Sequence, residues 1–205
     1  MSMSSRKFHR LSACFLAMYI VLHLGNHLVA VAGVHAHLAF MQAIRPLYRN
    51  AVVEPLLLAC VLFQCGSGIW MVLRGWKKRS GLVAWLQAGS GLYLALFLLV
   101  HVGAVLFGRA ALRLDTNFYY AAAGFVLMPY VLFFAPYYFL AVCALFTHLG
   151  CAAYWQVEAR SPMVRRLAIG VPAAVGLVLA VLIDLALSGV LHPLAIPAKY
   201  LMIYQ

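Results

Sequence analysis

Five long apolar segments decide what this chain can fold into. They cover roughly residues 11–34, 52–74, 82–108, 129–155 and 167–191. A helix needs about 20 apolar residues to cross the roughly 30 Å hydrocarbon core of a bilayer, and each segment is at least that long. The apolar residues run on without the period-two alternation of barrel strands. The sequence therefore predicts an all-α integral membrane protein with five transmembrane helices in a single membrane domain, residues 1–205.

The composition points to the same class of protein. Hydrophobic residues make up 66% of the chain and charged residues only 9%, whereas a soluble domain has about 25% charged residues. The net charge of +11 comes from basic residues that stand in short runs between the apolar segments, which is typical of membrane topology. We therefore expect membrane lipid around the chain and no nucleic-acid partner.

The basic residues also predict an orientation in the membrane. The positive-inside rule assigns the more basic side to the cytoplasm. This places the N-terminus inside and the C-terminus outside, with residues 35–50 and 109–128 as outer loops. The second of these loops contains FYYAAAGFVLM, which we expect to form a short interfacial helix. The ten basic residues of the inner side are Arg6, Lys7, Arg10, Arg74, Lys77, Lys78, Arg79, Arg160, Arg165 and Arg166; the five of the outer side are Arg45, Arg49, Arg109, Arg113 and Lys199.

Two histidines at matching depths on different segments form the main candidate site. His27 lies eight residues before His35, and His101 lies eight before Arg109. If His35 and Arg109 mark the outer interface, both histidines lie about 12 Å below it at 1.5 Å per residue. A six-coordinate haem takes its two axial nitrogens from facing helices in this way. We predict that His27 and His101 ligate the iron of haem b; the alternative is that both rings have structural roles.

Other polar residues in the apolar segments are further site candidates. His23 lies one helical turn from His27 on the same face, and could contact haem, bind a quinone or bond to a backbone carbonyl. Gln64 and His148 each stand ten residues before a charged residue, which places them at one inner depth. Glutamine is a poor iron ligand beside imidazole, so this pair cannot form a bis-histidine haem site.

Several of these residues stand in an order that resembles a known family. The chain looks like the single-chain, five-helix cytochrome b membrane anchor of succinate dehydrogenases and fumarate reductases. The resemblance runs from about Arg10 to Tyr154. It rests on Arg10-Leu11 before His27-Leu28, Arg49 and Glu54, Gln64 with Gly68, Gln87 and Gly91 before His101, and Phe146 with His148.

The resemblance implies ligands, cofactors and partners. Diheme members of the family hold a distal haem from helices one and three, and a proximal haem from helices two and four. His27 and His101 would hold the distal haem, and His148 would supply half of the proximal site. Gln64 departs from the family because a histidine is expected there. We therefore expect one haem b, and the second site is either empty, rearranged or ligated from elsewhere, with His23 as the nearby candidate.

The resemblance also implies a function. We expect an electron-transfer subunit, not itself the catalytic one, of an oxidoreductase complex in a bacterial inner (cytoplasmic) membrane. It would pass electrons between an iron–sulfur subunit and a membrane quinone, menaquinone or ubiquinone, with a flavoprotein subunit as further partner. Two alternatives stay open. One is a stand-alone or differently partnered haem protein, and the other is a haem-free structural anchor.

Two acidic residues and one histidine pair complete the candidates. Glu54, near the start of the second segment, is either the proton acceptor for quinol oxidation or a carboxylate that suits a helix N-terminus. Asp184 lies within LAVLIDLALSG and is expected to pair with an arginine or serine, or to carry protons. His35 and His37 form an HxH that we interpret as part of a solvated interfacial loop or as partners of haem propionates, rather than as a metal site.

Overall fold

The five expected membrane helices are present in the structure. It is a computed structural model that describes residues 3–205, and no strand occurs in that range. Five helices are long and apolar enough to cross a membrane, which confirms the predicted all-α class and the predicted number of candidate spans. They are α1 (Met3–Val29), α3 (Val53–Gly75), α4 (Leu82–Ala110), α6 (Val131–Gln156) and α7 (Pro162–Leu187).

Two helix starts differ from the sequence prediction. α1 begins eight residues earlier, because the basic N-terminal residues continue the helix beyond its apolar part. α7 begins at Pro162, five residues earlier than predicted. The hydroxyl of Ser161 accepts a hydrogen bond from the backbone N–H of Val164, and proline suits the first helical position. Capping and a favourable first residue therefore extend α7 into its polar flank.

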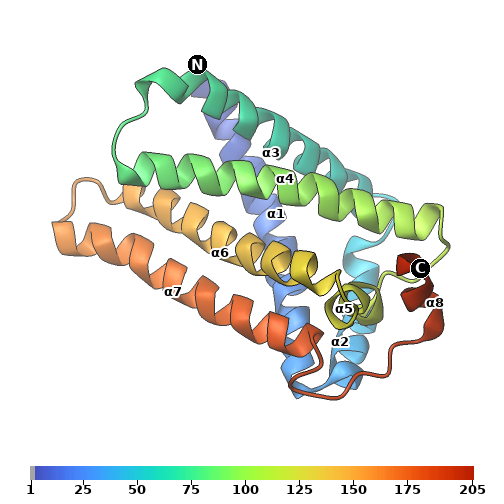
Figure 1. Cartoon of the computed structure of the whole chain (residues 1–205). Coiled ribbons are helices and arrows are strands. Elements are labelled where there is room, and N and C mark those ends of the chain that lie inside the picture. The colour runs from blue at the N-terminus through green and yellow to red at the C-terminus, as the bar shows by residue number, and fades with distance from the viewer. Residues whose placement is uncertain (1–2) are drawn as a thin grey trace.

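The long helices pack in a closed series. α1 packs on α3, α3 on α4, α4 on α6 and α6 on α7, while α7 returns to α1 (Figure 1). α1 and α4 are therefore not neighbours in the series. Side chains that extend from these two helices towards each other meet across the interior of the bundle.

The two ends of the bundle are built differently. One end holds the start of α1, the α3–α4 connection with the 3₁₀ turn η2 (Trp76–Lys78), and the α6–α7 connection (Figure 1). We call it the basic end, because it carries the ten basic residues that the sequence assigns to the inner side. The opposite end carries the short helices α2, α5 and α8 (Ala198–Leu201), and we call it the capped end.

The sequence predicts an outer loop at residues 35–50, and this prediction is wrong over most of that range. The chain forms α2 (Val34–Tyr48) there, which packs back against α1. The reversal follows the 3₁₀ turn η1 (Ala30–Ala32) and uses Gly33, whose φ of 115° is open to glycine but costly for other residues. His37 and Met41, one helical turn apart, are the buried residues of α2.

The short helix predicted before Pro129 is confirmed as α5 (Phe118–Val126). The carboxamide oxygen of Asn117 caps it by accepting a hydrogen bond from the backbone N–H of Tyr119. It does not lie at the surface, since Phe118 and Ala122 are fully buried. The C-terminal residues cover the same end, where the buried Tyr200 donates a hydrogen bond to the carbonyl of Asp115 at 3.0 Å.

Candidate functional site: a histidine cluster between α1, α2 and α4

Four imidazole rings form a continuous series in the half of the bundle near the capped end. The ring centres of His23 and His27 are 4.9 Å apart, because a spacing of four residues places both on one face of α1. The ring of His27 lies 5.4 Å from that of His37 on α2. The ring of His23 lies 6.0 Å from that of His101 on α4. We refer to these four residues as the histidine cluster.

Aromatic side chains border the cluster on the α1 and α4 sides. Tyr19 stacks on His23 with ring centres 5.5 Å apart. Phe97 stacks on His101 at 5.0 Å, and Tyr138 from α6 approaches the same ring edge-on at 5.9 Å. Aromatic rings therefore surround the imidazoles of His23 and His101.

Both predicted haem ligands lie in the cluster, but His27 and His101 lie at different depths along the bundle. The α1 ring that approaches His101 edge-on, with ring centres 6.0 Å apart, is His23, while His27 lies one turn further towards the capped end. The depth count assumed that His35 and Arg109 mark one plane. His35 instead stands on α2, after the chain has reversed. The pairing of His27 with His101 stays a prediction, and His23 is a second candidate for the same role.

His37 is the member of the cluster that the sequence interpretation missed. The HxH was expected in a solvated loop, yet His37 is only 2% exposed while His35 faces outward. The amide Nδ2 of Asn26 donates to Nε2 of His37 at 3.1 Å. Burial, and to a smaller extent the nearby His23, lowers the pKa of His37 to about 4, so the ring is neutral at pH 7. The spacing of four residues between His37 and Met41 in a helical pattern was the usable sequence signal.

Three polar atoms in this region are buried without a hydrogen-bond partner. They are Oδ1 of Asn26, Nδ1 of His27 and Nδ1 of His37. Each such atom costs about 1–3 kcal/mol when nothing satisfies it. Three of them on adjoining residues indicate a place where a polar molecule or a metal-containing cofactor would be stabilised.

Gln64 and His148, which the sequence places at one inner depth, are not joined to each other by a hydrogen bond. Nε2 of Gln64 donates to the carbonyl of His9 at 2.5 Å and to Oγ of Ser12 at 2.6 Å. Nδ1 of His148 donates to the carbonyl of Gln87 at 3.1 Å. His9 belongs to α1, because that helix extends back to Met3.

The acidic candidates lie nearer the capped end. Glu54, in the first turn of α3, forms an ion pair with Arg109 from the last turn of α4. Asp115 pairs with Arg45 at 3.0 Å. Asp184 was expected to pair with arginine or serine, but its buried Oδ1 has no hydrogen-bond partner among residues 3–205.

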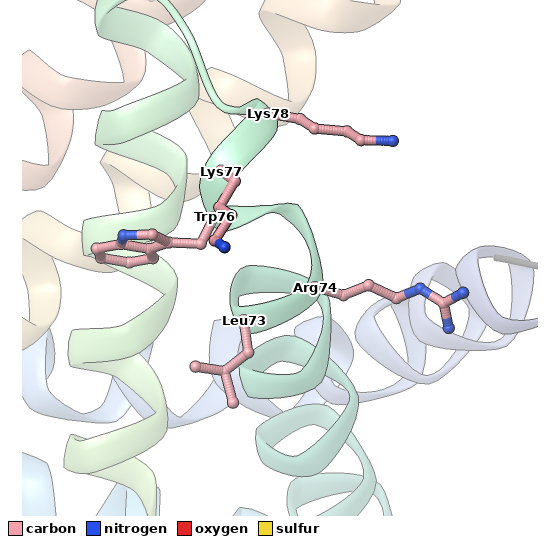
Figure 2. Close-up of a pocket in the computed structure, with 5 residues that line it drawn as sticks. All are labelled: Leu73, Arg74, Trp76, Lys77 and Lys78. Atoms are coloured by element: carbon pink, nitrogen blue, oxygen red, sulfur yellow. The ribbon is translucent and has the colours of Figure 1, made fainter.

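A pocket at the basic end offers different chemistry. It has a volume of about 570 Å³ and is lined by Leu73, Arg74, Trp76, Lys77 and Lys78. Figure 2 shows Arg74 and Lys78 extending to one side, while the indole of Trp76 lies on the other. The three cations of this lining suit an anion, but the lining holds no histidine or carboxylate for metal or proton chemistry.

The donor set of the histidine cluster decides which kind of metal centre is plausible. Within residues 3–205, no group of three His, Cys, Asp or Glu side chains is placed to hold a metal ion by itself. A haem iron needs only two protein ligands, because the macrocycle occupies its other positions. Comparisons with protein-family models, curated proteins and solved structures gave no match, so the chemistry of the site carries the functional argument.

Proposed function

We propose that this chain is a membrane cytochrome b, the anchor subunit of a succinate dehydrogenase- or fumarate reductase-like complex. The observation that carries the proposal is the pair of imidazoles from α1 and α4 that meet across the bundle interior, with His23 and His101 6.0 Å apart. Haem b, when bound, supplies a one-electron redox centre between an iron–sulfur partner and a membrane quinone.

The residues of the cluster fit the cofactor. A metal–nitrogen bond is about 2 Å long, so two imidazoles on opposite sides of one iron have ring centres about 6 Å apart. His23, His27 and His101 are each half-buried, and the rings of His27 and His101 both lie within 6.0 Å of the ring of His23. The buried Nδ1 of His27 has no hydrogen-bond partner, so a ligand bound at that nitrogen would remove the cost of leaving it unsatisfied.

The other residues near the cluster have proposed roles beside the cofactor. His101 is the ligand from α4, and α1 offers His27, favoured by the sequence spacing, or His23, favoured by the ring distance. The capped end is proposed to face outward, with Glu54 accepting the proton of a menaquinol or ubiquinol. The basic end is proposed to face the cytoplasm of a bacterium and its iron–sulfur and flavoprotein partners.

Haem content of single variants tests the proposal. The purified wild-type chain should show a b-type α-band in its reduced-minus-oxidised spectrum. His101→Ala should lower the haem-to-protein ratio by one, as should whichever of His23→Ala and His27→Ala removes the true α1 ligand. His35→Ala is the matched control, because His35 is exposed and lies next to the cluster. A wild-type chain without haem, when expressed with an ample haem supply, would contradict the proposal.

Co-purification separates the proposed complex from a stand-alone haem protein. The anchor should retain an iron–sulfur subunit and a flavoprotein subunit in mild detergent. A haem-loaded chain that is always isolated alone, even from its native membrane, would support the stand-alone alternative.

A further inference from the structure

The connection between α3 and α4 carries a cationic pocket that has no part in the proposed haem and quinone chemistry. Its volume of about 570 Å³ lies in the range of pockets that hold a small organic ligand. Figure 2 shows that Leu73 and Trp76 extend to one side of the turn, and Arg74 and Lys78 to the other. Lys77 completes the lining. The pocket therefore offers both cations and apolar surface to one ligand.

The cations of the pocket have no carboxylate partner within residues 3–205. Arg74, Lys77 and Lys78 are exposed, and all three ion pairs of the described chain involve Glu54 or Asp115 near the capped end. Three positive charges on one short turn repel one another, so an anion bound among them would be stabilised. Phosphate suits such a site, because its oxygens accept charge-assisted hydrogen bonds from arginine and lysine.

Tryptophan side chains around the pocket indicate its depth in the membrane. Trp76 packs edge-on against Trp85 with ring centres 5.0 Å apart. The guanidinium of Arg79 lies over both indoles, at 5.7 Å and 5.3 Å from the ring centres. The guanidinium of Arg74 lies 5.2 Å from the ring centre of Trp70. Because tryptophan is enriched at the headgroup level of a bilayer, we expect the pocket to lie at the depth of the lipid phosphates.

Leu73 gives the pocket an apolar edge that a free anion would not need. Its side chain is 68% exposed, although it lies near the end of a helix long and apolar enough to span a membrane. Leu82, at the start of α4, is exposed as well. A phospholipid joins a phosphate to acyl chains, so it can contact the cations and Leu73 at once. The apolar edge therefore favours a lipid over a soluble phosphate.

We propose that this pocket binds the phosphate of an anionic phospholipid. Arg74, Lys77 and Lys78 surround the phosphate, and the acyl chains lie against Leu73. An anionic lipid is favoured over a zwitterionic one, because the same cations repel a choline group. The site needs no haem, so this proposal goes beyond the proposed function and does not rest on it.

Native mass spectrometry of the full chain, with any subunits that co-purify, tests the proposal. The protein in detergent is titrated with phosphatidylglycerol or with phosphatidylcholine of the same acyl chains. We expect one phosphatidylglycerol to bind per chain in clear preference to phosphatidylcholine. The double variant Lys77→Gln, Lys78→Gln should bind phosphatidylglycerol about 25-fold more weakly, since each basic residue near a headgroup contributes about fivefold in affinity.

The α6–α7 connection offers a matched control for charge. The double variant Arg160→Gln, Arg166→Gln removes the same charge from the same end of the bundle, but neither residue lines the pocket. Both residues are exposed, so the variant should fold and keep its phosphatidylglycerol. Leu73→Ser tests the apolar edge, and should weaken the binding of phosphatidylglycerol without changing the binding of inorganic phosphate.

Three results would overturn the proposal. Equal losses in the two double variants would mean that lipid responds to the overall charge of the basic end rather than to the pocket. Inorganic phosphate that displaces phosphatidylglycerol and binds as tightly would identify a free anion as the ligand. Equal affinity for phosphatidylglycerol and phosphatidylcholine would exclude a site for anionic lipid. Equal elution volumes in size-exclusion chromatography would show that all variants fold, and haem content tests the proposed function separately.

Discussion

At the scale of single residues, the ion pair of Glu54 and Arg109 links the starting turn of α3 to the final turn of α4. If Glu54 accepts the quinol proton, Glu54→Gln removes the base without removing the haem ligands. We expect quinol-driven haem reduction to slow by about a hundredfold or more, the usual scale of general base catalysis. Stopped-flow absorbance of the haem band would measure this rate.

Two control variants separate the proton role from the structural role of the pair. Arg109→Gln breaks the same ion pair but keeps the carboxylate, and Asp115→Asn removes another carboxylate of the capped end. If Arg109→Gln slows the reaction as much as Glu54→Gln at unchanged haem content, the pair acts by holding α3 and α4 together rather than through proton transfer.

His27, His101 and His37 show which site residues a sequence can and cannot reveal. His27 and His101 stand out because they interrupt strongly apolar segments, and a residue count places them near one depth. The sequence predicts His37 in a loop, because the local pattern does not reveal that the chain reverses at Gly33 and that α2 packs back along α1. Tertiary packing rather than local composition places this imidazole.

At the scale of helices, the contact between α6 and α7 depends on a small residue. A Cβ atom at Gly176 on α7 would lie 2.5 Å from Cβ of Phe146 on α6. Gly176→Ala therefore forces the helices apart, and we expect the free energy of unfolding to fall by about 1–3 kcal/mol, as for other overpacked sites. Unfolding in mixed detergent micelles, followed by circular dichroism, measures the change.

Gly170 provides a matched control on the same helix. A Cβ atom there would meet nothing within 4 Å. Alanine favours a helix interior over glycine by about 1 kcal/mol, so Gly170→Ala should leave stability unchanged or raise it. Equal losses in the two variants would mean that the contact between Gly176 and Phe146 does not set the helix spacing.

The helices themselves follow from hydropathy, whereas their ends do not. α3, α4 and α6 lie within about two residues of the predicted spans, because the apolar runs stop at charged or turn-forming residues. α7 starts earlier because Ser161 and Pro162 begin it, and α2 was missed because its 15 residues are too few for a span. Segment length and average hydropathy detect membrane spans, but not a short helix that folds back on one of them.

At the scale of the whole molecule, charge separates the two ends of the bundle. All three ion pairs among residues 3–205 involve Glu54 or Asp115, near the capped end. The ten cations of the basic end have only Glu158 as an acidic residue near them in sequence, and none of them forms an ion pair with a carboxylate within the described chain. Because short basic connections are retained in the cytoplasm, we expect the basic end to face inward.

Fusions at the two termini test this orientation. A fluorescent protein that matures only in the cytoplasm should fluoresce when joined to the N-terminus and stay dark when joined to the C-terminus. Alkaline phosphatase, which needs an oxidising compartment, should be active only at the C-terminus. The reverse pattern would place the basic end outside and would remove it as a docking face for a cytoplasmic iron–sulfur subunit. It would leave the histidine cluster and its haem-binding tests unaffected, since ligand geometry does not depend on orientation.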